Sequence, residues 1–455
     1  MILTPGAKSR IQSISRDHIE QTTSDLRRYF AKNLWLAPNN RYRSDTINKV
    51  RKDFDVAGNF TSVKQSNLAH YIASSTQMHC IDGWSYLASA VNALLRGDGH
   101  AAVHLAYYAE LRAAMSILAT DGIGVLNGRH CALTGPMKAD KLPTKNGGTH
   151  DFAWMALEEW SEKSSAGDLI AESVTPFGIP LSNWFSTLPG SYTLKPLARS
   201  WIKDWGVDLK RLADRERGDR HARNEASYRP TALSSDHPVS ASDAVRLAGQ
   251  FWEMCEPVGS SKFEMLDRRL LRHSMKAIFT GRNATPALAS NDGYRAFVTS
   301  LVGSQATLSD QYRKEIETYL LRDEAGGIDN ILKLARASIS DPNQAQLGVI
   351  ARAFLLLRMA SGTVDVTLRK AGVTESELKF WKDDLLSGRG LCAPNSPPEE
   401  LADLWQDVDL ELEEIRQHLA NGKDLSFTSI RSEFDRTLVR LTSFDAVPLW
   451  AIARV

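Results

Sequence analysis

The chain has 455 residues, of which 43% are hydrophobic and 24% are charged, and its formal net charge at pH 7 is +1. This length predicts two domains, each with enough apolar residues to bury a core. Because the charges nearly balance, the field of the whole chain favours neither nucleic acid nor an anionic membrane, and any such function has to depend on local patches.

The cysteines and the apolar segments limit the class of protein further. The four cysteines are Cys80, Cys131, Cys255 and Cys392. They lie far apart and form no CxxC pair, which excludes a compact zinc module and argues against a disulfide framework. No apolar stretch typical of a secretory signal follows the N-terminus, and the apolar run from Leu347 to Met359 contains Arg352 and Arg358, which argues against a membrane span. We expect a cytoplasmic protein without metal, cofactor or membrane partner.

Residues 1–60 are predicted to form a basic N-terminal extension. Residues 1–53 contain 11 Lys and Arg against 5 Asp and Glu, with a basic cluster from Arg41 to Lys52. The helical pattern here is weak and has polar interruptions. This composition fits a solvated face or a partly mobile arm, and it also fits an arm that faces nucleic acid or a partner protein.

Residues 61–235 contain the best-formed helices. Apolar residues recur at intervals of three and four from Trp84 to Leu94, and Gly97-Asp98-Gly99 ends that helix. The next helix, His100 to Ala119, has one face of large apolar residues and a second face of alanines that allows close helix packing. The Gly-rich stretch from Gly128 to Gly148 is predicted to be a surface excursion.

Two further helices complete this region, one from Asp151 and one from Leu194 towards Arg215. The Ser- and Pro-containing segment 231–240 is the predicted domain boundary. Beyond it, residues 236–455 are predicted to form a helical C-terminal domain. Its expected helices are 241–255, 262–279, 294–302, 309–321, 328–339, 344–359, one that opens at a Thr374–Glu377 capping box, and an acidic one over 399–419. Alternating strand-like runs are almost absent, so the predicted fold class is all-α.

The segment HLAYYAELRAAMSILATDGIGVLNGRH, from His104 to His130, resembles the central helix of the HEPN family. In that family a Tyr-Tyr-Ala helix with further alanines runs into a Gly-ended turn and then a His. The matching residues are Tyr107, Tyr108, Ala109, Ala113, Ala114, Leu118, Gly122, Ile123 and His130. The resemblance covers about residues 70–230 and implies a HEPN-like four-helix bundle. It also implies a homodimer and a role in a bacterial-type defence or toxin system.

The second marker of this resemblance is the segment from Asp219 to Tyr228, DRHARNEASY. Active HEPN ribonucleases carry an Arg and a His with four to six residues between them, often with a polar residue just after the Arg. The resemblance therefore implies metal-independent RNA cleavage, in which Arg stabilises the scissile phosphate and His moves the proton of the 2′-hydroxyl. Arg223 and Asn224 match the start of this motif.

The chain departs from the family pattern where the His is wanted, because Tyr228, Arg229 and Pro230 occupy those positions. Tyrosine is a poor base at neutral pH but can donate a hydrogen bond to a phosphate. A catalytic His then has to be His221 or His130, brought close by folding; Arg215 and His221 also have the spacing of an Arg–His pair. The candidate catalytic set is Arg223, Asn224, His221 and Tyr228. The alternative is that Arg223 and Asn224 are structural.

Residues 195–229 are modestly basic and interleaved with Trp201, Trp205 and Tyr228, a composition that suits single-stranded nucleic acid as well as core packing of the tryptophans. The candidate nucleic-acid-binding residues are Arg215, Arg217, Arg220 and Arg229.

Three functions follow from these patterns. The first is a HEPN-like protein that binds or acts on RNA, either alone as a homodimer or as a non-catalytic subunit of a larger complex. The second is an active metal-independent endoribonuclease. The third is a DNA-binding protein that uses the helix-turn-helix-like segment from Leu368 to Trp381, although Glu375 and Glu377 at the start of its second helix would repel phosphate.

Overall fold

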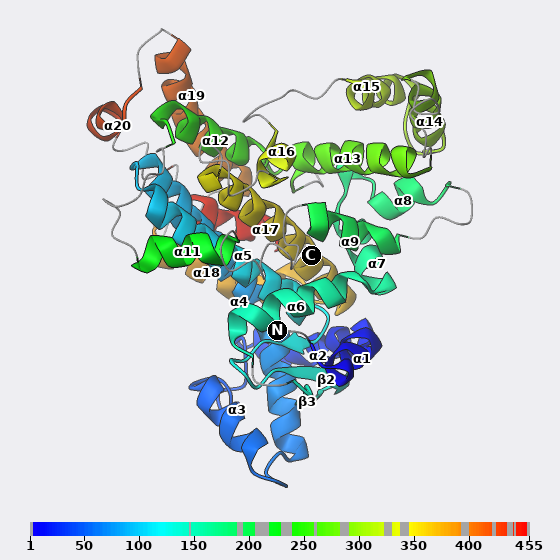
Figure 1. Cartoon of the computed structure of the whole chain (residues 1–455), viewed down its shortest axis with the longest axis vertical. Coiled ribbons are helices and arrows are strands. Elements are labelled where there is room, and N and C mark those ends of the chain that lie inside the picture. Colours follow the sequence, from blue (N-terminus) through cyan, green and yellow to red (C-terminus); the bar gives the residue numbers. More distant parts are fainter. Residues whose placement is uncertain are drawn as a thin grey trace.

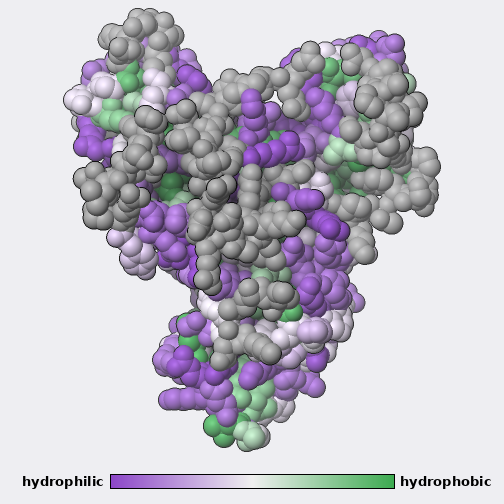
Figure 2. All heavy atoms as spheres, viewed as in Figure 1, coloured by the Kyte–Doolittle hydropathy of each residue, from purple (hydrophilic) through white to green (hydrophobic). Residues whose placement is uncertain are grey.

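The computed structural model describes residues 3–144, 147–188, 194–204, 218–228, 239–258, 262–282, 291–322, 330–336, 345–392, 400–420, 425–434, 440 and 443–452. The chain is mostly helical and has one small three-stranded sheet (Figure 1). The helical class predicted from the sequence is therefore confirmed, while the sheet was not expected. Hydrophilic residues dominate the described part of the face shown in Figure 2.

Three long helices form the centre of the molecule (Figure 1): α4 (Ser62–Leu95), α5 (Gly99–Ala119) and α17 (Ala345–Lys370). Helix α17 packs against both α4 and α5, although it lies far from them in the sequence. The pattern of apolar residues and the stop at Gly97 place α4 and α5 as predicted. Helix α17 begins where expected but continues beyond Met359 to Lys370, because the residues from Gly362 to Leu368, apart from the half-buried Asp365, are also buried.

Helix α17 is long and apolar enough to cross a membrane, judged by length and composition alone. The apolar stretch of the helix is entirely buried inside the protein, and two of the helix's arginines, Arg352 and Arg358, each contact a carboxylate there. Arg358 donates two hydrogen bonds to Asp267, at 2.7 and 2.8 Å. These contacts are typical of a core helix in a folded protein, where buried charges are paired.

The N-terminal residues form three helices: α1 (Pro5–Ser13), α2 (Arg16–Phe30) and α3 (Thr46–Asp55). Helix α2 packs on α4 and α17, and α1 packs on α6. Ile11, Leu26 and Phe30 are buried at these contacts. Helices α1 and α2 are thus part of the packed core, so a partly mobile arm, one of the interpretations of residues 1–53, does not describe them.

The small sheet contains β1 (Ile123–Gly124), β2 (Cys131–Gly135) and β3 (Lys138–Lys141), in the antiparallel order β1-β2-β3. Cys131, Ala132 and Leu133 are buried. The prediction of a surface excursion over 128–148 is therefore wrong for residues 131–133 and 139, which are buried, whereas residues 136–138 at the turn between β2 and β3 are exposed. These strands are too short to produce an alternating pattern, which is the usual sequence signal for a strand.

Shorter elements surround the central helices. Those in the first half are α6 (Thr149–Ser161), α7 (Ser164–Ser173), η1 (Pro176–Gly178), α8 (Leu181–Phe185), α9 (Lys195–Asp204) and α11 (Asp219–Tyr228). Those in the second half are α12 (Ala241–Glu253), α13 (Glu264–Arg282), α14 (Asn291–Gly303), α15 (Asp310–Leu321), α16 (Ile331–Arg336), α18 (Glu375–Gly388), α19 (Leu401–Ala420), α20 (Phe427–Glu433), η5 (Ser443–Ala446) and α22 (Val447–Ala451).

The two halves of the chain share one hydrophobic core. Trp84 on α4 contacts Phe354 on α17 edge to face, with ring centroids 5.8 Å apart, and stacks on Phe263. Most of the predicted domain boundary, residues 231–240, lies outside the described residues. The division into an extension, a bundle and a C-terminal domain stays a prediction, but the described parts of the bundle and of the C-terminal region are packed together.

Candidate functional site

Helix α11 lies beside α5 and presents one face to it (Figure 1). Asp219, Arg223 and Ser227 are spaced by four residues, so their side chains lie on the same side of the helix. Asp219 is buried and accepts two hydrogen bonds from Arg352 on α17, at 2.6 and 2.7 Å. This ion pair fixes the first turn of α11. Arg223 and Ser227, further along the same face, then contact side chains of α5.

Arg223 lies against two tyrosines of α5. Its guanidinium carbon is 5.3 Å from the ring centroid of Tyr107 and 5.8 Å from that of Tyr108, distances at which a cation is attracted to an aromatic face. The residue is only 9% exposed, and its Nε–H has no hydrogen-bond partner among the described residues. A buried, charged donor without an acceptor is costly, so this group is suited to an anion supplied from outside.

His104 on α5 is held by Ser227. The Ser227 hydroxyl donates to the carbonyl oxygen of Arg223 at 2.7 Å, and His104 Nδ1 lies 2.7 Å from the same hydroxyl oxygen. Since the single hydroxyl proton is used on the carbonyl, we assign the proton of this second contact to His104 Nδ1. Burial and the nearby Arg223 lower the pKa of His104. The imidazole is therefore neutral at pH 7, with Nε2 as an unprotonated acceptor.

His150, at the start of α6, is held by Tyr107. The indole Nε1 of Trp154 donates to the Tyr107 hydroxyl at 3.4 Å, and that hydroxyl lies 3.1 Å from His150 Nδ1. Burial raises the pKa of Tyr107 to about 12, so the phenol keeps its proton. We assign that proton to the contact with His150, which leaves His150 with its own hydrogen on Nε2. Burial and the nearby Arg223 and Arg220 lower the pKa of His150.

A buried network of charged residues connects α5, α11 and α17 next to the cluster. Glu110 on α5 lies 3.5 Å from Arg352, which also binds Asp219. Burial and the neighbouring Asp219 raise the pKa of Glu110 well above its usual value. The single buried guanidinium of Arg352 therefore faces two carboxyl groups, and Glu110 holds its proton more strongly than an ordinary glutamate. At the rim, Arg220 forms an ion pair with Asp151.

The cluster formed by His104, Tyr107, Tyr108, His150 and Arg223 is half-buried at its two histidines and at Tyr108. It combines a guanidinium whose Nε–H has no partner in the described part of the chain, an imidazole whose Nε2 can accept a proton, and an imidazole whose Nε2 can donate one. These groups are the components of acid–base catalysis on a phosphodiester, in which one group removes a proton and a cation stabilises the phosphate.

The structure brings together only part of the set expected from the sequence. Arg223 faces the cluster, and Arg220 lies at its rim. His221 and Tyr228 lie on the opposite side of α11, because residues two and five positions from Arg223 project away from its face, and Tyr228 is 80% exposed. Asn224 is half-buried beside Arg223 along the helix. Arg215, Arg217 and Arg229 lie outside the described residues.

His130 and Trp201, two other residues singled out in the sequence, are packed in the protein core. His130 is fully buried, stacks on Phe152 at 3.6 Å between centroids, and uses both ring nitrogens in hydrogen bonds to the backbone of Leu126 and Gly147. Trp201 is 1% exposed and belongs to the core, while Trp205 lies outside the described residues.

The helix-turn-helix-like segment is also packed. Glu377 in its second helix, α18, accepts hydrogen bonds from Arg27 on α2 at 3.0 and 3.1 Å. Leu378 and Trp381 on the same helix are buried.

Of the five cluster residues, only Arg223 was a candidate site residue from the sequence; Tyr107 and Tyr108 were named as matches to the HEPN helix, and His104 and His150 were not identified. A signal for His104 exists in the sequence, since it lies four residues before Tyr108 on one helical face, and their rings are 5.1 Å apart. His150 carries no such signal, because it approaches Tyr107 from a different helix.

No protein-family model, curated protein or solved structure matches the chain.

Proposed function

We propose that the chain is a HEPN-like protein that binds RNA at the Arg223 cluster and cleaves it without a metal ion. The observation that carries the proposal is the Arg223 side chain beside two half-buried neutral imidazoles; it is nine-tenths buried, and its Nε–H has no partner among the residues that the structure describes. In this proposal α4, α5, α6 and α9 correspond to the four-helix bundle of the family, followed by a second helical domain. A role in a defence or toxin system, and a homodimer, follow from the same resemblance.

The proposed reaction is transesterification of the RNA backbone. His104 Nε2 takes the proton of a 2′-hydroxyl, the 2′-oxygen attacks the adjacent phosphorus, and the bond from phosphorus to the 5′-oxygen breaks. The leaving 5′-oxygen takes a proton from His150 Nε2–H, so that the products are a 2′,3′-cyclic phosphate and a 5′-hydroxyl. Arg223 neutralises the charge on the phosphate oxygens in the transition state.

A second candidate, a non-catalytic RNA-binding subunit of a larger complex, is favoured by a different observation. Arg223 is only 9% exposed and is held between the two tyrosines of α5, which is also the place of an arginine that simply fastens α11. In that case RNA would contact the rim at His104, His150 and Arg220 without being cleaved.

The test is incubation of the purified protein with labelled single-stranded RNA in EDTA, with analysis of the product ends. Variants Arg223→Gln and His104→Gln are compared with His221→Gln. This control makes the same His-to-Gln change on the far side of α11. We expect cyclic-phosphate ends from the unmodified protein and from His221→Gln, and a loss of at least about 100-fold in rate in the other two. RNA that binds but stays intact would assign the protein to the non-catalytic class, and RNA that does not bind would contradict both candidates.

A further inference from the structure

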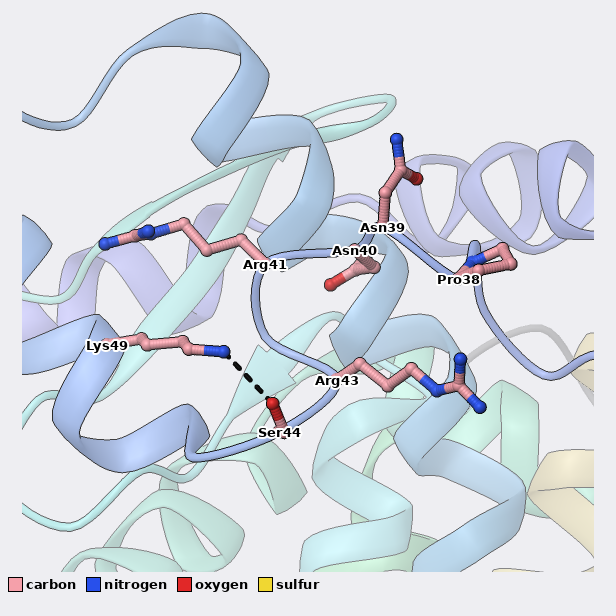
Figure 3. Close-up of a pocket in the computed structure, with 7 residues that line it drawn as sticks. All are labelled: Pro38, Asn39, Asn40, Arg41, Arg43, Ser44 and Lys49. Carbon is pink, nitrogen blue, oxygen red and sulfur yellow. Dashed lines mark hydrogen bonds between the residues drawn. The ribbon is translucent and has the colours of Figure 1, made fainter.

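A basic groove lies in the N-terminal part of the chain, along the loop after α2, with α3 at one end and the end of α2 and the start of α4 at the other. It consists of two adjoining cavities of about 650 and 450 Å³, which share Asn39, Asn40 and Arg41. Figure 3 shows the larger cavity, where Arg43 and Lys49 extend their side chains beside the 38–44 loop. The smaller cavity adds Arg28 and Lys64. No carboxylate lines either cavity among the described residues.

The positive charge of this groove is only partly neutralised. Arg41 and Lys64 each contact Asp53, at 2.6 and 2.9 Å, and Arg28 contacts Asp25 at 2.7 Å. Five cations therefore face two carboxylates.

The positive charge that remains unneutralised lies on Arg43 and Lys49. Neither forms an ion pair within the part of the chain that the structure describes, and Lys49 Nζ donates instead to the Ser44 hydroxyl at 3.1 Å (Figure 3). The exposed Asp45 lies next in sequence to Ser44 but accepts from Asn48 and does not line the groove.

The loop that carries these cations is fixed in place before any ligand arrives. The buried Asn40 donates to the carbonyl oxygen of Asn67 and accepts from the backbone N–H of Tyr42, both at 2.9 Å. Asn67 in turn accepts from the backbone N–H of Arg41 at 2.9 Å, and the Tyr42 hydroxyl donates to Asp53 at 2.8 Å. A preorganised loop loses little conformational entropy on binding, so its charges are available at low cost.

We propose that this groove binds the phosphate backbone of an RNA strand, with Arg43 and Lys49 as phosphate contacts. The proposal rests on the proposed function, since it assigns a second contact for the same ligand. Guanidinium and ammonium groups are the usual partners of phosphate oxygens. Two adjoining cavities with cations spread along both fit an extended polyanion better than a single phosphate, which is normally enclosed by convergent donors.

The test is binding of an uncleavable 2′-O-methyl oligonucleotide, measured by fluorescence anisotropy over a series of salt concentrations. The groove variant Arg43→Gln/Lys49→Gln is compared with Arg51→Gln/Lys52→Gln, which removes two exposed cations of α3 that do not line the groove. For a single strand each phosphate contact contributes about −0.7 to the salt slope. We therefore expect the slope of the groove variant to be shallower by about 1.4, with affinity roughly 25-fold lower near 0.1 M salt. The α3 variant should bind like the unmodified protein.

An equal loss in both variants would show that only general charge matters and would overturn the proposal. A second outcome would overturn the groove proposal alone. In it, Arg223→Gln binds the oligonucleotide more weakly than the unmodified protein, whereas the groove variant binds it equally well. Absence of any binding by the unmodified protein would overturn the proposed function and the groove together. Pyrophosphate, titrated by calorimetry, is expected to bind more weakly than the oligonucleotide, and an equal affinity would assign the groove to small phosphates instead.

Discussion

Arg352 on α17 binds Asp219 on α11 through two parallel hydrogen bonds of 2.6 and 2.7 Å, and both side chains are buried. The same guanidinium also donates to the carbonyl oxygen of Ala335 on α16 at 2.8 Å. A helix from the C-terminal half of the chain therefore positions the helix that carries Arg223. The candidate site cannot be separated from α17, although the site residues themselves lie within residues 104–227.

The first prediction concerns the Asp219–Arg352 pair. Asp219→Ala leaves a buried guanidinium without its closest carboxylate and should lower the free energy of unfolding by about 3–5 kcal/mol. Urea unfolding measures the loss, and hydrogen exchange should show faster exchange in α11 than in α4. Asp168→Ala is the control, because Asp168 is exposed on α7; a change there is expected within about 0.5 kcal/mol. Equal stability of the two variants would contradict this account.

The second prediction follows from the raised pKa of Glu110. In the unfolded chain this carboxyl group titrates near 4.5, and in the folded protein it titrates well above that value. Between the two values only the folded protein binds the proton, so the contribution of Glu110 to the free energy of unfolding falls as the pH rises. Glu110→Gln keeps a neutral side chain at every pH and should lack this loss.

The measurement is urea unfolding from pH 4.5 to 8. The Glu110→Gln variant should match the unmodified protein at the acidic end and become the more stable of the two at the basic end. Glu414→Gln, which removes an exposed carboxylate of α19, should follow the pH dependence of the unmodified protein. Parallel curves for the unmodified protein and Glu110→Gln would mean that Glu110 is ionised in the fold.

The third prediction concerns the histidines of the cluster. Burial, and then the charge of Arg223, lower the pKa of His104 below its usual 6.5. Arg223→Gln removes that charge and should move the pKa of His104 upward, towards 6.5. Imidazole proton resonances followed by NMR titration report the change directly and do not require any catalytic activity.

His70 serves as the internal reference for this titration. Its pKa is lowered mainly by burial, with Asp25 acting in the opposite direction, and Arg223 is not among the groups that affect it. Its titration should therefore be the same in both proteins. A His104 resonance that titrates identically with and without Arg223 would show that the guanidinium is not close enough to act on the imidazole.

The sequence predicted local structure better than long-range contacts. The stop at Gly97 and the capping box of Thr374 and Glu377 are both confirmed, because each depends on residues a few positions apart. The sheet over 123–141 was missed because its strands are short. Arg223 was identified from its motif, whereas His150 was not, because its contact with Tyr107 exists only after α6 packs on α5. Arg352 likewise appeared only as an interruption of an apolar run, because its partner Asp219 is far away in the sequence and no neighbouring residue indicates the pairing.

The last prediction concerns the packing of α17 against α7 at Gly362. A Cβ added there would lie 2.8 Å from the Ser173 Cβ, 3.0 Å from the Ser173 carbonyl oxygen and 2.6 Å from the Arg358 guanidinium. The Ser173 carbonyl also accepts a hydrogen bond from Arg358 at 2.9 Å, so the two helices cannot separate without weakening this contact and the Arg358–Asp267 pair. Although alanine favours a helix over glycine by about 1 kcal/mol, Gly362→Ala should therefore be destabilising overall, by about 1–3 kcal/mol.

The matched control is Gly388→Ala, at the last residue of α18, where an added Cβ meets nothing within 4 Å. Thermal unfolding should show a lower Tm for Gly362→Ala and an unchanged or higher Tm for Gly388→Ala. Because α17 also carries Arg352, which binds Asp219, a displacement of α17 at Gly362 should weaken the attachment of α11. Hydrogen exchange in α11 should therefore become faster in Gly362→Ala only. A Gly362→Ala protein as stable as the control would mean that α17 and α7 do not approach as closely as the structure places them.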